Sequence, residues 1–239
     1  MPKYYIGFDC GTQGTKVAIY NEDSVLVTEA YKEHEISYPK PGWAEMEAMQ
    51  FHHAVCDGIR QCVSSAKINP RDVRAISCSG VICGIVLVDE RWNPVSPYVL
   101  YLDTRSKDTA REIREKLEPI WIEESGNSTV DSFLPPVILK WFITSRKEIV
   151  AQSRKAVSIA PYVMGKLGGF KAENAYIDWA HLSGWIIGYD ASRRNWSDRQ
   201  LALLGIPREL VPEVKRPWDV VGTLTAEQAE LTGLRPGIP

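Results

Sequence analysis

The chain has 239 residues and a formal net charge of −2, with 28 lysines and arginines against 30 aspartates and glutamates. Because the positive and negative charges nearly cancel, the composition offers no basic surface for nucleic acid or for an anionic membrane. No apolar run approaches the roughly 18 residues that a spanning helix needs, and the N-terminus enters a predicted strand without a signal peptide. The five cysteines show no Cys-x-x-Cys pair. We therefore expect a cytoplasmic enzyme part with reduced thiols and with no nucleic-acid or membrane partner.

Residues 4–20 predict two strands joined by a turn of small polar residues. Gly11 and Gly14 allow the backbone to turn sharply or to approach a ligand closely. Beside them stand a carboxylate for a cation, groups that donate to oxyanions, and one ammonium: Asp9, Thr12, Gln13, Thr15 and Lys16. This is the chemistry of a magnesium–nucleotide phosphate site.

Two other interpretations of this turn compete with the phosphate site. A Walker A loop needs four residues between its glycines and a helix after it. Gly11 and Gly14 are too close together, and a strand follows, so that interpretation fails. The remaining alternative is a hairpin whose glycines merely shape the turn.

The following elements alternate between strands and helices. A polar turn at residues 21–23 leads to a third strand that opens at Val25. Further along, the patterns predict helices over 45–66, 107–124 and from Pro135, and strands over 73–79, 85–89 and 98–101. Ser197 is a plausible N-cap for a helix through Leu204, with Gly205 as its stop. Strands first, then alternating helices and strands, predict an α/β domain with a mixed sheet flanked by helices.

The three-strand meander with a phosphate-type first turn resembles the actin-like, ribonuclease-H-like ATPase fold of sugar kinases. Three further segments resemble motifs of the FGGY carbohydrate kinases: Gly-Trp-x-Glu at residues 42–45, Trp-x-Asp-x-Arg at 101–105, and the Asp-x-Ser-x-Ala-Ser…Trp stretch at 178–196. The resemblance covers nearly the whole chain, and within the family xylulokinases are the most similar.

The resemblance implies that residues 1–239 are the N-terminal, sugar-binding domain of a two-domain kinase. Such an enzyme transfers the γ-phosphate of ATP to a hydroxyl of a ketose or polyol with the help of Mg²⁺. The catalytic aspartate and the C-terminal nucleotide-binding domain would then follow Pro239, so the chain alone is expected to be inactive. FGGY enzymes are often dimers, so a homodimer is also implied.

The resemblance also assigns roles at the first turn. Asp9 would hold magnesium, largely through water. Donors to the β- and γ-phosphates would come from the turn that Gly11 shapes, namely from Thr12, Gln13, Gly14 and Thr15. Lys16 either reaches phosphate or points outward from its strand.

The sugar site is predicted from two other segments. Asp103 and Arg105 would share a strand face and bind adjacent hydroxyls, with a surface ion pair as the alternative. Glu45 either reaches a sugar hydroxyl or stabilises the positive end of a helix. Asp178 is expected to position a loop, and His181 to be a structural hydrogen-bonding residue.

One loop departs from the family pattern. Xylulokinases carry Gln-Met-His-Gly where this chain has Val81, Ile82, Cys83 and Gly84. These more apolar substrate-binding residues favour a less hydroxylated polyol or an autoinducer-type diketone hydrate over xylulose. Cys83 either lines the pocket or packs as a small hydrophobic group.

Two alternatives come from other functional classes. A chaperone or filament ATPase of the actin-like fold shares the opening turn but lacks the Gly-Trp-x-Glu and Asp-x-Arg motifs. A non-catalytic sugar-binding or regulatory protein would be favoured if the chain were naturally short.

Overall fold

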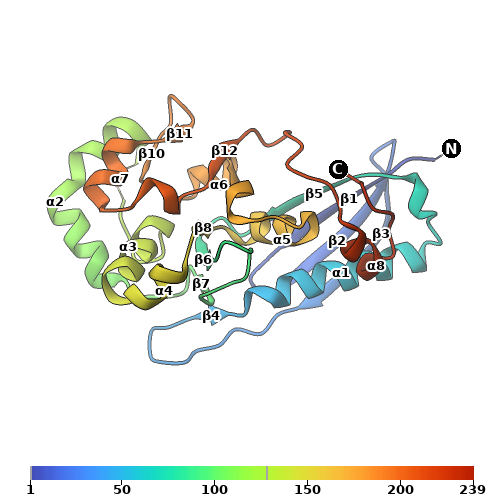
Figure 1. The fold of residues 1–239 in the computed structure, drawn as a ribbon, viewed down its shortest axis with the longest axis horizontal. Coiled ribbons are helices and arrows are strands. Elements are labelled where there is room, and N and C mark those ends of the chain that lie inside the picture. Colours follow the sequence, from blue (N-terminus) through green and yellow to red (C-terminus); the bar gives the residue numbers. More distant parts are fainter. Residues whose placement is uncertain (1, 128) are drawn as a thin grey trace.

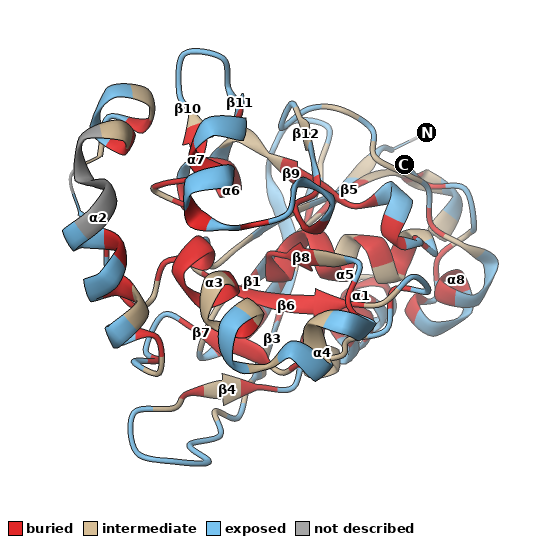
Figure 2. Ribbon diagram, turned by 60° about the vertical axis from the view of Figure 1, so that its left-hand side comes forward, coloured by how far each residue is buried: buried red, intermediate tan, exposed pale blue. Residues whose placement is uncertain are grey.

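The chain builds two β-sheets, each with its own helices (Figure 1). The computed structural model describes residues 2–127 and 129–239, without the side chains of residues 116–119. The N-terminal strands lie at one end of the molecule, and the helices of residues 107–145 lie at the other (Figure 1). Both described chain ends lie beside the first sheet (Figures 1 and 2).

The predicted meander forms most of the first sheet. Strands β1 (Tyr4–Cys10), β2 (Gly14–Asn21) and β3 (Leu26–Glu33) are antiparallel, and β5 (Val73–Gly80) pairs in parallel with β1. The order is β3-β2-β1-β5. The mixed sheet that the sequence predicts is therefore confirmed.

Helices cover one face of this sheet. Helix α1 (Ala48–Ser65) and helix α5 (Ile159–Gly168) share one buried apolar cluster with Ile6, Phe8 and Val17. The alternate residues of β1 and β2 face the other way, and Tyr5 and Lys16 on that side are exposed. The first sheet therefore has one buried face and one face that the described chain leaves open.

The second sheet lies on the other side of α5. It has the order β4-β7-β6-β8, with β4 (Glu45–Met46), β6 (Gly84–Val88), β7 (Tyr98–Leu100) and β8 (Lys155–Val157), all antiparallel. Strand β6 is buried along its whole length (Figure 2). A second apolar cluster joins these strands to the surrounding helices α2 (Lys107–Ser125), α3 (Pro135–Ser145), α4 (Lys147–Gln152), α6 (Trp179–Ser183) and α7 (Asp198–Leu204).

Short elements complete the chain. Strands β9 (Tyr176–Asp178) and β12 (Glu213–Lys215) form a parallel pair, and β10 (Tyr189–Asp190) and β11 (Asn195–Trp196) form an antiparallel pair. Helix α8 (Ala226–Thr232) packs against α1. Single 3₁₀ turns occur at Pro70–Asp72, Ala172–Asn174 and Arg208–Leu210.

Two predicted boundaries were wrong. The first helix begins at Ala48 rather than Glu45, because Glu45 and Met46 form β4 and pair with β7. The strand predicted over 98–101 ends at Leu100, so Asp103 and Arg105 lie in the turn before α2 and not on a strand. Within residues 2–127 and 129–239, none of the helices combines the length and apolar character needed to cross a bilayer.

Candidate functional site

Polar side chains gather on the open face of the first sheet, where β1 ends. Asp9 is exposed and lies directly across from Lys16 on β2 and from Ser79 on β5. The Ser79 hydroxyl donates a hydrogen bond of 2.6 Å to Oδ1 of Asp9. A carboxylate, an ammonium and a hydroxyl thus form a row across three strands. The sequence did not decide whether Lys16 reaches phosphate or points outward. Because Lys16 pairs with Asp9, its side chain lies on the same face of the sheet as Asp9.

The turn after Asp9 presents backbone donors. The N–H of Gly11 donates to the carbonyl of Gly14 at 3.1 Å, which closes the turn. A Cβ on Gly14 would lie 2.4 Å from the Tyr31 ring, so only glycine fits there. Within the described part of the chain, the amide N–H groups of Thr12 and Gln13 have no acceptor. Both are therefore free to donate to an oxyanion.

Thr15 behaves differently from the other residues of the turn. Its side chain is fully buried, and its hydroxyl lies 2.8 Å from Nε2 of His34. The hydroxyl therefore faces the core rather than Asp9. Lys16 keeps only a loose, exposed ion pair of 3.8 Å with Glu29. Of these two predicted phosphate ligands, Lys16 is the one whose polar group is exposed on the Asp9 side.

These groups fit a magnesium-bound phosphate better than a metal site made of protein alone. Nowhere in the described ranges do three or more His, Cys, Asp or Glu residues cluster as metal ligands. Magnesium commonly takes one or two carboxylates and completes its shell with water and substrate phosphate. Asp9 can supply the carboxylate, and the free amides of Thr12 and Gln13 can bind the phosphate oxygens.

The residues predicted to bind sugar form a closed network instead of an open site. Arg105 donates from Nε to Oδ1 of Asp103 at 2.9 Å and from Nη2 to Oδ2 at 2.7 Å. Nη2 also lies 2.7 Å from Oε1 of Glu45, and the guanidinium stacks 3.8 Å from the Trp43 ring centre. The N–H of Ala44 donates to Asp103 at 2.6 Å.

This network is buried. The side chains of Arg105 and Asp103 are 2% and 0% exposed. The pairing that was considered as a surface alternative is therefore present, but inside the protein. The network joins the loop before α1 to the turn before α2. A direct contact of the Asp103 or Arg105 side chain with a sugar stays a prediction.

The apolar loop between β5 and β6 packs against α6. The N–H of Val81 donates to the carbonyl of Cys10 at 3.0 Å, and the Cys83 thiol lies 3.7 Å from the carbonyl of Gly184. Burial raises the pKa of that thiol. Ile82 is 44% exposed and is the loop residue that lines the neighbouring groove.

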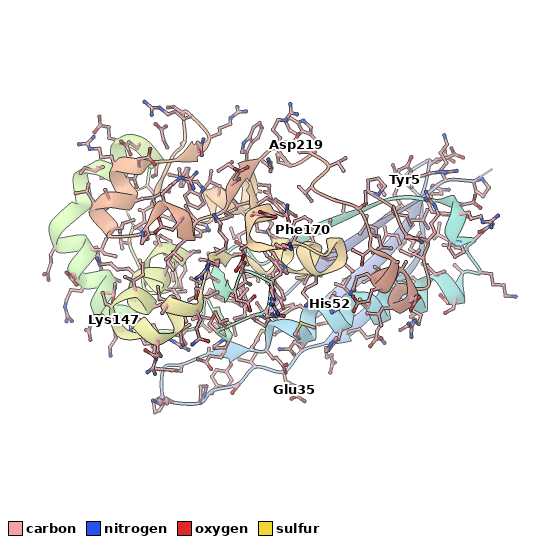
Figure 3. All side chains as sticks on the ribbon, viewed as in Figure 1. Tyr5, Glu35, His52, Lys147, Phe170 and Asp219 are labelled. Atoms are coloured by element: carbon pink, nitrogen blue, oxygen red, sulfur yellow. The ribbon has the colours of Figure 1, made fainter. Side chains whose placement is uncertain are left out.

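This groove runs along the outer edge of β5, and we call it the β5–α6 groove. Its volume is about 440 Å³, within the range of small-ligand sites. Its polar and aromatic lining includes Ser77, Ser79, Tyr176, Asp178, His181 and Trp218. Asp219, on the segment between β12 and α8 and labelled in Figure 3, also lines the groove. The groove reaches Asp9 through Ser79.

Asp178 caps the helix α6, whereas the sequence predicted that it would position a loop. Oδ1 accepts from the N–H groups of Ala180 and His181 at 2.8 and 3.1 Å, and Oδ2 lies 2.6 Å from Nδ1 of His181. Burial opposes ionisation, but these hydrogen bonds outweigh it and lower the pKa of Asp178. Nε2 of His181 is buried and has no hydrogen-bond partner among the described residues.

Sequence reasoning missed four of these groove residues, Ser77, Ser79, Tyr176 and Trp218. The alternation of Ser77 and Ser79 on β5 was a usable signal, because residues two apart on a strand share a face. Trp218 gave no such signal. It lies in an irregular segment and reaches the groove only through tertiary structure.

Comparisons with known proteins point to one family. A profile described as "FGGY family of carbohydrate kinases, N-terminal domain" matches residues 4–239. A xylulose kinase from Staphylococcus xylosus is 25% identical over 232 residues, which are 97% of this chain and 46% of that protein. A glycerol kinase from Bacillus mycoides is 22% identical over 93% of this chain and 45% of its own length.

The solved structures give the same result for the fold. The crystal structure of xylulose kinase from Rhodospirillum rubrum matches with a TM-score of 0.87 and 26% identity, over 99% of this chain and 48% of that one. The chain thus spans about half the length of the curated relatives that it matches.

Proposed function

The chain belongs to the FGGY family of carbohydrate kinases, and on that premise we propose that it is the N-terminal, sugar-binding part of an ATP-dependent kinase. The whole protein transfers the γ-phosphate of ATP to a hydroxyl of a ketose or polyol. The relatives named xylulose kinase and glycerol kinase support this acceptor class. Family membership also sets aside the chaperone and filament ATPases considered from the sequence.

One observation carries the proposal. The exposed Asp9 lies beside two free amide donors, at Thr12 and Gln13, and opposite Lys16. In the proposed reaction, Mg²⁺ and these donors neutralise the charge that develops on the transferred phosphate. Asp9 would hold the ion through water, the two amides would bind phosphate oxygens, and Lys16 would add a positive charge.

The chemical identity of the acceptor is defined less closely than the phosphate site. The loop offers a substrate no side-chain amide or imidazole, because its residues are Val81, Ile82 and Cys83. A polyol with fewer hydroxyl groups for the protein to bind is therefore favoured over xylulose. The proposal includes a cytoplasmic location, supported by five cysteines that are all free thiols. It also includes a homodimer, for which the family resemblance is the support.

The catalytic aspartate belongs to a segment beyond residue 239 in this proposal. The support is the length of the relatives, of which the chain matches less than half. Accordingly, the 239-residue chain should form no ADP from ATP in the presence of xylulose or glycerol. Robust turnover by this chain would contradict that placement of the base.

The phosphate site is tested on the 239-residue chain by measuring the Mg²⁺-dependent binding of ADP with ³¹P NMR. Binding is expected for the unmodified chain and at least tenfold weaker binding for Asp9→Asn, because a charged ligand of the ion is lost. Asp23→Asn, an exposed aspartate in the next turn, is the matched control. Equal binding by both variants, or none by the unmodified chain, would refute the phosphate site.

A further inference from the structure

One hydrogen bond holds the carboxylate of Asp9. The Ser79 hydroxyl on β5 donates to Oδ1 of Asp9 on β1 at 2.6 Å. This distance is typical of a hydroxyl that donates to an ionised carboxylate, which is one of the stronger kinds of hydrogen bond in proteins. An ionised carboxylate only accepts, so the direction of the bond is fixed, with Ser79 as the donor.

No other described side chain restrains this carboxylate. Asp9 is exposed, and it takes part in no ion pair within residues 2–127 and 129–239. Lys16 lies across from it on β2, but its ammonium pairs with Glu29 at 3.8 Å. The terminal torsion of an aspartate has a broad range, so an exposed carboxylate without a partner samples many orientations. Ser79 therefore decides how the carboxylate is turned.

The second carboxylate oxygen is directed at the phosphate turn. A Cβ placed on Gly11 would lie 3.5 Å from Oδ2 of Asp9, so this oxygen lies beside the start of the turn. The same turn carries the free N–H groups of Thr12 and Gln13. Because Ser79 occupies Oδ1, Oδ2 is left available on the side of these donors. The hydrogen bond thus selects the oxygen that faces the proposed phosphate site.

Ser79 is itself held firmly, because the end of β5 is fastened to the end of β1. The parallel pairing runs as far as Cys10 and Gly80, and the N–H of Val81 donates to the carbonyl of Cys10 at 3.0 Å. A Cβ on Gly80 would lie 3.0 Å from that of Ala160 on α5, so the strand end also packs closely against this helix. A side chain on such a rigid element positions its partner more precisely than one on a loop does.

We propose that Ser79 is a positioning residue for Mg²⁺-dependent phosphate binding, in which its hydroxyl holds the Asp9 carboxylate in the orientation that binding requires. A carboxylate that is already oriented loses less conformational freedom when a ligand binds, which raises the affinity. The inference rests on the proposed function and deepens it, because it assigns a role to a residue outside the predicted phosphate-binding set.

The decisive variant is Ser79→Ala, which removes the hydroxyl from an exposed position on β5 and should leave the urea midpoint of the 239-residue chain unchanged. Binding of ADP is followed by ³¹P NMR while Mg²⁺ is titrated. The Mg²⁺ concentration that gives half-maximal ADP binding should rise about fivefold, which corresponds to the loss of one hydrogen bond. ADP binding in the absence of Mg²⁺ should stay the same.

Further variants separate the hydrogen bond from other effects of the substitution. Ser79→Thr keeps a hydroxyl and should bring the Mg²⁺ dependence to within about twofold of that of the unmodified chain. Ser77→Ala removes an exposed hydroxyl two residues earlier on the same strand face and is the matched control. In a chain that already carries Asp9→Asn, adding Ser79→Ala should weaken binding less than about twofold, because the carboxylate that Ser79 orients is gone.

Two results would overturn the inference and leave the phosphate site in place. One is a Ser79→Ala chain with the Mg²⁺ dependence of the unmodified chain, while Asp9→Asn loses ADP binding. The other is an equal loss of ADP binding in Ser79→Ala with and without Mg²⁺, which would indicate a structural role for the hydroxyl. Failure of the unmodified chain to bind ADP in the presence of Mg²⁺ would refute the proposed function, and this inference would fail with it.

Discussion

The hydroxyl of Thr15 lies 2.8 Å from Nε2 of His34, across the loop side of β2 and β3. This hydrogen bond ties the end of the phosphate turn to the end of β3, and the His34 ring packs 4.3 Å from that of Phe51 on α1. Thr15 thus supports the turn from inside. In the proposed function, its neighbours Thr12 and Gln13 are the residues that donate to the ligand.

Thr15→Val should therefore act on stability first. The substitution leaves the His34 ring without its partner in a half-buried site, which is expected to lower the free energy of unfolding by about 1–3 kcal/mol. Urea denaturation at pH 7 measures this. Thr15→Ser retains the hydroxyl and should lose less than half as much, whereas equal losses would show that the methyl group matters more than the hydrogen bond.

His34 should make stability fall in acid. Burial lowers its pKa to about 4, below the 6.5 of a free histidine. Between these values the unfolded chain binds a proton that the folded chain does not, so stability is lost as pH falls from about 6.5 toward 4. His34→Gln removes this proton, and its melting temperature should decline less steeply over that interval. An unchanged slope would contradict the assignment.

Arg105→Lys should destabilise the protein strongly. Lysine cannot reproduce the two-pronged contact with Asp103, the bond to Glu45 and the stacking on Trp43. The loss is expected to be about 3 kcal/mol in urea denaturation, because buried carboxylates are left poorly paired. Arg111→Lys, in an exposed pair with Asp108, is the control and should be neutral. A stable Arg105→Lys chain would contradict this structural role of the network.

Gly58→Ala tests how closely α1 approaches the sheet. A Cβ at Gly58 would lie 2.6 Å from Cγ2 of the buried Val17, so the helix must move away. The expected loss is about 1–3 kcal/mol, which outweighs the gain in helix propensity from alanine. Gly7→Ala on β1 meets nothing within 4 Å and should leave the denaturation midpoint nearly unchanged.

Local signals predicted much of the fold. Ser197 does cap α7, accepting a hydrogen bond from the N–H of Gln200, and Gly205 ends that helix in the left-handed conformation. The strands of the meander were predicted equally well, because alternation of apolar residues and the glycine turn depend only on neighbours in sequence.

Side-chain partners far apart in sequence were not predictable in this way. Thr15 was expected to face a ligand, but its hydroxyl pairs with His34, which directly follows the neighbouring strand β3. The groove depends on β5 and α6, which are about a hundred residues apart along the chain, so no spacing rule could bring Ser79 and His181 together. Tertiary packing decides such contacts.

The buried apolar side chains fall into two clusters, one under the first sheet and one around β6 and α3. Regions with separate cores commonly open as separate cooperative units. Amide protons of β1 and β2 should therefore exchange with solvent deuterons at different rates from those of α3 and α7. The Arg105 network joins these two units, because Ala44 belongs to the first cluster and Trp141, beside the Arg105 guanidinium, packs against the second. Weakening the network should therefore speed exchange in both units at once.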